Sequence, residues 1–192
     1  MLVSRSTEES HLYMYLHPCE CGEDDFEWRD HEIVSGNGWL VSIYSGECGR
    51  CDRPRSFEFA LAPEPSPPPP SLGGSKPSSI IDPGEFLDTA QRLMAGVPAD
   101  PTRVDDDEFH AARDALAFAV ASVEEVLKFI PDGADLVPEE AFRSELGGRL
   151  HRRSPELFRR HRLTATLAEY RRLLSAYDAA IAVPAVGGGV SQ

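Results

Sequence analysis

The sequence has little lysine, no long apolar run and too few basic residues to balance its acids. Lys76 and Lys128 are the only lysines among 19 basic residues, and 32 acidic residues bring the net charge of the 192-residue chain to −13. General nucleic-acid binders need a basic surface, so this balance argues against that class. A helix that spans a membrane needs a run of about 18 apolar residues, and the sequence has none. We therefore expect no membrane span.

Signals for export and for catalysis are also missing. The N-terminal stretch MLVSRSTEES lacks the basic-then-apolar pattern of a signal peptide, so we expect a cytoplasmic protein. There is no G-x-S-x-G, no phosphate-binding loop, no G-x-G-x-x-G and no H-E-x-x-H. We therefore expect a protein that is not an enzyme. The preference for Arg, Ala, Gly and Pro is typical of a high-GC bacterial genome.

A proline-rich stretch divides the chain. Residues 63–79 read PEPSPPPPSLGGSKPSS, and proline lacks the amide donor that helices and inner strands require. We expect a linker here, with residues 1–62 forming one unit and residues 80–183 another. The glycine-rich residues 184–192 are expected to be a disordered tail.

Residues 1–62 show the period-two patterns of β-strands. Apolar residues alternate with other residues at 12–16, near 26–28 and at 57–61, and residues 39–44 are rich in aromatic and β-branched side chains. The sequence Gly36-Asn37-Gly38 predicts a tight turn between two strands. We expect about four antiparallel strands.

Residues 80–183 show helical patterns. Asp82-Pro83 is a good helix start, and a second start at Asp105 precedes apolar residues spaced by three, four and seven positions up to Ile130. Further helices are expected from Pro138 and from Ser154-Pro155. The sequence thus predicts an α+β fold, in which a small antiparallel sheet precedes a bundle of about four helices.

All four cysteines lie in the first unit, as two close pairs. Cys19 and Cys21 form a C-x-C pair, Cys48 and Cys51 form a C-x-x-C pair, and 26 residues lie between the two pairs. Two tight turns that face each other can supply four thiolates in the tetrahedral arrangement that Zn²⁺ prefers.

With its expected strands on either side of each pair, the segment of about residues 12–61 resembles the zinc-ribbon class. The resemblance implies a structural zinc ion held by Cys19, Cys21, Cys48 and Cys51. The first pair is one residue shorter than the usual C-x-x-C, and His17 is an alternative ligand in place of Cys19. His31 is a weaker candidate for a metal ligand.

Two other interpretations of the cysteines stay open. Two disulfides are possible, but without an export signal we expect a reducing compartment. The second interpretation is redox chemistry at Cys48-Gly49-Arg50-Cys51, although a thioredoxin-type motif needs a βαβ context. Four thiolates around one zinc leave no open position for water, so we expect no catalysis at the metal.

One region is rich in arginine. Residues 149–172 hold eight arginines, which either form a face for nucleic acid or an acidic partner, or neutralise the acidic helices before them. We favour neutralisation.

The aromatic residues of the first unit are expected to dock against the helices, with a partner-binding patch as the alternative. They are Tyr13, Tyr15, Trp28, Trp39 and Tyr44.

These features favour a non-enzymatic module that binds another protein. An immunity protein against a bacterial toxin is one concrete form, and an adaptor or chaperone in a secretion-type assembly is another. The alternative is a nucleic-acid-binding zinc-ribbon regulator. Residues 1–62 carry five arginines against twelve acids, which disfavours contact between this unit and phosphates.

Overall fold

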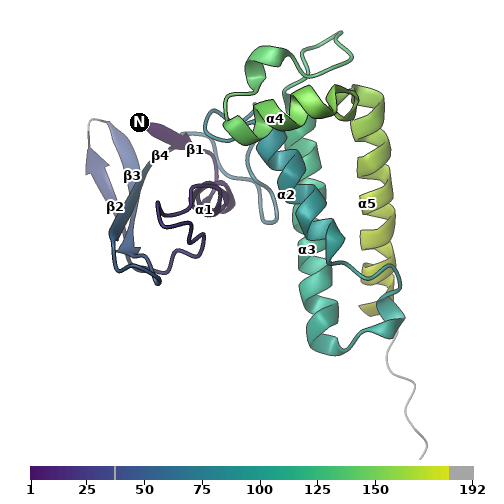
Figure 1. The fold of residues 1–192 in the computed structure, drawn as a ribbon, viewed down its shortest axis with the longest axis horizontal. Coiled ribbons are helices and arrows are strands. Elements are labelled where there is room, and N and C mark those ends of the chain that lie inside the picture. The colour runs from purple at the N-terminus through teal and green to yellow at the C-terminus, as the bar shows by residue number, and fades with distance from the viewer. Residues whose placement is uncertain (37, 182–192) are drawn as a thin grey trace, which may run out of the picture.

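The computed structural model describes residues 1–36 and 38–181, and it has the expected α+β architecture (Figure 1). Four strands form one sheet in the order β1-β4-β3-β2; they are β1 (Leu2–Ser4), β2 (Trp28–Gly36), β3 (Trp39–Glu47) and β4 (Pro54–Leu61). The number of strands agrees with the prediction. The sheet is mixed rather than fully antiparallel, because β1 runs parallel to β4.

The strand predicted around residues 12–16 is wrong. This segment is helix α1 (Thr7–Leu16), which begins at the N-cap Ser6, whose hydroxyl accepts a hydrogen bond from the amide of Glu9. Leu12 packs into the core of the helices and Met14 into the core of the sheet. Because α1 is buried on two sides, its apolar residues lack the spacing of a one-sided helix and imitate a strand.

Four α-helices follow the proline-rich segment, which agrees with the predicted number, although the helix expected from Pro138 is a short 3₁₀ turn, Glu139–Ala141. They are α2 (Pro83–Ala95), α3 (Asp106–Lys128), α4 (Glu145–Arg153) and α5 (Arg160–Ile181). The predicted start of the last helix at Ser154-Pro155 is instead a short 3₁₀ turn, Pro155–Phe158. Arg159 is extended and bridges to Leu136, so α5 begins only after it. Among the described residues, no helix is long and apolar enough to cross a membrane.

Asp82 joins two of these helices. Its buried carboxylate accepts hydrogen bonds from the amides of Gly84 and Glu85 at the start of α2, and from those of Arg143 and Ser144 just before α4. The predicted helix start at Asp82-Pro83 is therefore confirmed, and this side chain also fixes where α4 begins.

The proline-rich segment packs against both sides of the molecule. Leu72 is fully buried in the helical core, and the ammonium group of Lys128 donates to the carbonyl of Gly74 at 2.6 Å. The guanidinium of Arg5, between β1 and α1, donates to the carbonyl of Lys76. These contacts hold the segment along the junction. The predicted tail, residues 184–192, lies outside the described residues.

Helix α1 lies between the sheet and the helical bundle (Figure 1). One face of the sheet packs on α1, where Tyr44 and Phe59 are buried and Tyr13 is half-buried. The expectation that the aromatic residues dock on the helices after the linker therefore holds for Tyr13, whereas Tyr44 packs on α1 of the first unit and Tyr15 is exposed. Trp28 and Trp39 keep 40% and 37% of their surface exposed.

Candidate metal centre

The first cysteine pair lies in a tight turn that follows α1. The amide of Cys19 donates to the carbonyl of Glu23 at 2.7 Å, and the amide of Gly22 donates to the carbonyl of Cys19 at 2.8 Å. Gly22 has φ +87°, a backbone conformation that favours glycine. This turn lets a pair with only one intervening residue direct both sulfurs to the same side.

The second pair connects β3 to β4. The amide of Cys48 donates to the carbonyl of Arg53, and the amide of Asp52 donates back to the carbonyl of Cys48, both at 2.9 Å. Asp52 adopts φ +54°, in the left-handed region that Asp tolerates better than most residues. The C-x-x-C sequence thus sits in a closed turn between two strands, outside any βαβ unit.

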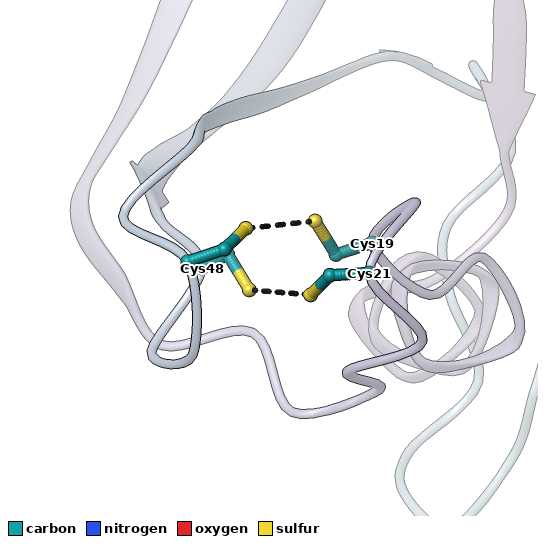
Figure 2. Close-up of side chains that lie close together, drawn as sticks. Cys19, Cys21 and Cys48 are labelled. Carbon is teal, nitrogen blue, oxygen red and sulfur yellow. Dashed lines mark hydrogen bonds between the residues drawn. The ribbon is translucent and has the colours of Figure 1, made fainter.

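The two turns face each other and bring all four sulfurs together. Figure 2 shows Cys19 and Cys21 pointing from one loop toward Cys48 on the other. The Sγ atoms of Cys19 and Cys51 are 3.7 Å apart, those of Cys21 and Cys48 are 3.6 Å apart, and all four lie within 4.8 Å of one another. A zinc–sulfur bond of about 2.3 Å gives a tetrahedron with edges of about 3.8 Å. The cluster therefore has the size that one tetrahedrally bound zinc ion requires.

The surroundings shift the pKa values of the two cysteines of the second pair in opposite directions. The amide of Arg50 points at the sulfur of Cys48 and is the main reason why the pKa of that thiol falls to about 7. At Cys51 the amide of Arg53 acts in the same direction, but the neighbouring sulfurs of Cys21 and Cys48 outweigh it and raise the pKa to about 12. Four thiols this close oppose one another's ionisation, and a cation among them removes that conflict.

Neither histidine belongs to the cluster. The Nδ1 atom of His17 is 2.7 Å from the carbonyl of Tyr13, and its ring stacks on the ring of the same tyrosine. The Nε2 atom of His31 is 2.8 Å from the hydroxyl of Ser42. The structure therefore brings together the four cysteines, and it disfavours His17 as a replacement for Cys19.

Further contacts between the two turns were not anticipated from the sequence. Arg53 forms an ion pair with Glu20, and the guanidinium of Arg50 lies 3.4 Å from the carbonyl of Cys21. Gly46 allows β3 to approach the loop after the first turn, because a Cβ atom there would lie 2.5 Å from the carbonyl oxygen of Glu27. The only sequence signal for these positions was their closeness to the cysteines.

None of the four cysteines forms a disulfide, and Cys19 and Cys48 are buried whereas Cys21 and Cys51 are exposed. Their sulfur separations are far beyond the roughly 2.05 Å of a disulfide bond. The arrangement can hold a metal ion with four protein ligands.

The arginine-rich region is only partly neutralised. Arg149 pairs with Glu145, Arg171 pairs with Glu124 of α3, and Arg160 donates to backbone carbonyls. The other five make no ion pair with any described residue; they are Arg152, Arg153, Arg159, Arg162 and Arg172.

Comparison of the chain with protein-family models, with curated proteins and with solved structures finds no match. The inference of a metal-binding module therefore depends on the geometry of the four cysteines alone, which can hold a metal ion.

Proposed function

We propose that the four cysteines hold a structural zinc ion and that this zinc-ribbon-like module binds another protein without catalysing a reaction. The observation that carries the proposal is the cluster of four sulfurs with zinc-sized separations of 3.6 and 3.7 Å. Zn²⁺ is the ion that four thiolates in a tetrahedron select most often. With four protein ligands the ion has no position left for water or substrate.

Exposed apolar residues indicate where a partner would bind. Of the nine large apolar side chains exposed in the described part of the chain, five lie on the hairpin formed by β2 and β3. They are Trp28, Ile33, Val34, Trp39 and Leu40. Scattered exposed apolar residues are normal, but their concentration on one element is typical of a protein-binding surface.

The charge of the molecule favours a basic partner. Residues 1–62 have a net charge of −7, from five arginines and twelve acidic residues. An immunity protein that covers the basic active site of a nuclease toxin fits this charge, because its acids take the place of the nucleic-acid substrate. An adaptor or chaperone in a bacterial secretion-type assembly fits it as well.

The second candidate is a nucleic-acid-binding regulator. The observation in its favour is the set of five exposed arginines between Arg152 and Arg172 that lack ion pairs among the described residues. Against it stands the acidic charge of the module that holds the cysteines, since contact with phosphates needs cations there.

Metal analysis tests the first part of the proposal. The purified chain should contain one zinc per molecule, and Cys48→Ser should abolish tight binding. His17→Gln is the matched control and should retain the metal, because His17 bonds to Tyr13 and lies outside the cluster. A chain that binds no zinc at neutral pH with reduced thiols would overturn the metal assignment.

Affinity capture from the native cells tests the second part. A tagged chain should retain a stoichiometric basic protein after nuclease treatment, and Leu40→Asp on the hairpin should release that protein. Associated molecules that disappear with nuclease would instead favour the regulator. The Leu40→Asp chain should keep its zinc, which separates loss of the surface from loss of the fold.

A further inference from the structure

The two edges of the sheet differ in how the rest of the chain covers them. At one edge, β1 is only three residues long, and the hydroxyl of Ser79 lies 3.5 Å from the carbonyl of Val3. At the other edge, β2 is nine residues long, and every one of them is exposed. Within the described part of the chain, β2 has β3 as its only neighbour. An open edge of this length can accept another strand.

The register of the hairpin identifies the backbone groups that β2 presents. Gly36 and Trp39 are partners with two residues between them in the sequence, and such a pair is the hydrogen-bonded pair that closes a hairpin. Bonded and non-bonded pairs alternate along an antiparallel ladder. The amides and carbonyls that point away from β3 therefore belong to His31, Ile33 and Ser35.

The side chains of β2 differ between the two faces of the sheet. His31 and Ile33 lie opposite buried residues of β3 and so share the face that α1 covers. Asp30, Glu32 and Val34 lie on the other face. A strand added beside β2 would place alternate side chains next to these two sets.

Acidic residues that form no ion pair lie on β2 and in the segment just before it. Six acidic side chains between residues 23 and 32 make no ion pair with any described residue; they are Glu23, Asp24, Asp25, Glu27, Asp30 and Glu32. Arg29 is the one basic residue in this stretch if histidines are left aside, and it pairs with Glu47 at 3.1 Å. A strand that binds here must therefore bring positive charge. A second copy of this acidic chain is disfavoured.

We propose that β2 accepts an extended segment of the partner protein as a fifth strand, and that this segment alternates basic with apolar residues. Its apolar side chains would lie on the α1 face beside Ile33. Its lysines or arginines would lie on the opposite face, beside Asp30 and Glu32. The inference rests on the proposed function as a protein-binding module and specifies the chemistry of that partner.

Three seven-residue peptides probe the edge of the zinc-loaded chain. The first alternates lysine with valine, the second has the same composition with all lysines before all valines, and the third alternates glutamate with valine. Fluorescence anisotropy gives their affinities, and amide hydrogen exchange by NMR identifies the backbone groups that become protected. We expect binding of the alternating lysine peptide alone, weakened by added salt, with protection at Ile33 and Ser35.

Two variants at position 33 separate the contribution of the backbone amide to binding from that of the side chain. Ile33→Pro removes an outward amide and spares the bonds to β3, because proline is tolerated at such edge positions. We expect it to weaken binding roughly tenfold, as loss of a backbone hydrogen bond predicts. Ile33→Thr keeps the amide and should weaken binding less. Zinc content and circular dichroism verify that both variants fold.

Several outcomes would overturn the strand addition. They are equal binding of the block-ordered peptide, no binding of the alternating one, an Ile33→Pro chain that binds like the parent, or self-association of the chain through β2. Binding of an oligonucleotide in place of the peptide, with protection at β2, would also overturn it. If Ile33→Pro binds the native partner with the same affinity as the parent chain, the strand addition fails while the protein-binding function stands.

Discussion

At the scale of single residues, the junction between the sheet and the helices depends on a buried charge network. The guanidinium of Arg5 lies 2.6 Å from Glu9 of α1 and 2.9 Å from Glu125 of α3. Both carboxylates are almost fully buried, and Lys128 also contacts Glu125. Removing one partner from such a network leaves a buried charge without compensation.

We expect Glu125→Gln to lower the free energy of unfolding by about 3 kcal/mol. Urea denaturation measures this change. The neighbouring Glu124→Gln is the matched control, because Glu124 is partly exposed and pairs with Arg171 on the surface. Its effect should stay within about 1 kcal/mol. Equal effects of the two variants would show that the network contributes no more than a surface ion pair.

Replacement of two adjacent glycines of α4 by alanine should change the stability of the protein in opposite directions. A Cβ atom on Gly147 would lie 2.3 Å from the carboxylate of Asp82, which is buried and fixed by four amides. A Cβ atom on Gly148 would meet only the end of the exposed Arg152 side chain, at 3.2 Å.

Gly147→Ala should therefore destabilise the protein by about 2 kcal/mol through overpacking. Gly148→Ala should stabilise it by about 0.5–1 kcal/mol, because alanine favours a helix more than glycine does. Thermal unfolding of the two variants beside the parent gives the sign of each stability change directly. A stabilised Gly147→Ala chain would mean that α2 and α4 can move apart at little cost.

At this scale the sequence predicted that the four cysteines lie together, but it did not predict the charge network. The residue type and the spacing of the cysteines are enough to indicate a cluster, and both can be read without knowledge of the fold. Arg5 and Glu125 are 120 positions apart, and nothing in either neighbourhood distinguishes them from surface residues. Their burial follows only from how α1 and α3 pack.

At the scale of elements, α1 shows how a local pattern can mislead. Leu12 and Met14 point to different cores, and this two-sided burial produced the period-two pattern that predicted a strand. The sequence did contain the helix signal, since Ser6 followed three residues later by Glu9 is the pattern of a capping box. The N-cap and register of α2 were predictable, because they depend on neighbouring residues, Asp82-Pro83 and the Glu85 that completes the capping box.

The contact between α1 and the edge of the sheet should depend on pH. The ring of His11 stacks on Trp28 at 4.7 Å and meets Tyr44 edge-on, and its burial there lowers its pKa below the usual 6.5. Glu8 opposes this shift, while nearby His31 adds to it. The folded state thus binds a proton less readily than the unfolded state, and His11 costs stability as the pH falls below about 6.5.

We expect the parent chain to lose stability relative to His11→Gln between about pH 7.5 and pH 5.5, because glutamine does not titrate. Urea unfolding at these two pH values measures the difference. The comparison of two chains cancels the titration of groups that they share, provided that His31 keeps its stacking on Tyr44. A difference that does not change with pH would show that His11 can become protonated in the fold without cost.

At the scale of the whole molecule, the two units predicted from the sequence are connected by much more than a linker. Composition correctly indicated that residues 63–79 form no helix or strand of the sheet. It did not reveal that Leu72 is buried in the helical core or that Lys128 and Arg5 hold the segment. Such contacts depend on partners more than fifty residues away, which a local reading of proline and glycine does not include.

This junction predicts that the sheet and the helices unfold together. Both tryptophans, Trp28 and Trp39, lie in the sheet, so their fluorescence reports on it, whereas circular dichroism at 222 nm reports mainly on the helices. In the zinc-loaded chain the two signals should change at the same temperature. Removal of zinc should lower both midpoints together, because loss of the sheet exposes the apolar side of α1 and breaks the contacts of Arg5. Two separate transitions in the parent chain would show that the buried network and α1 do not couple the units.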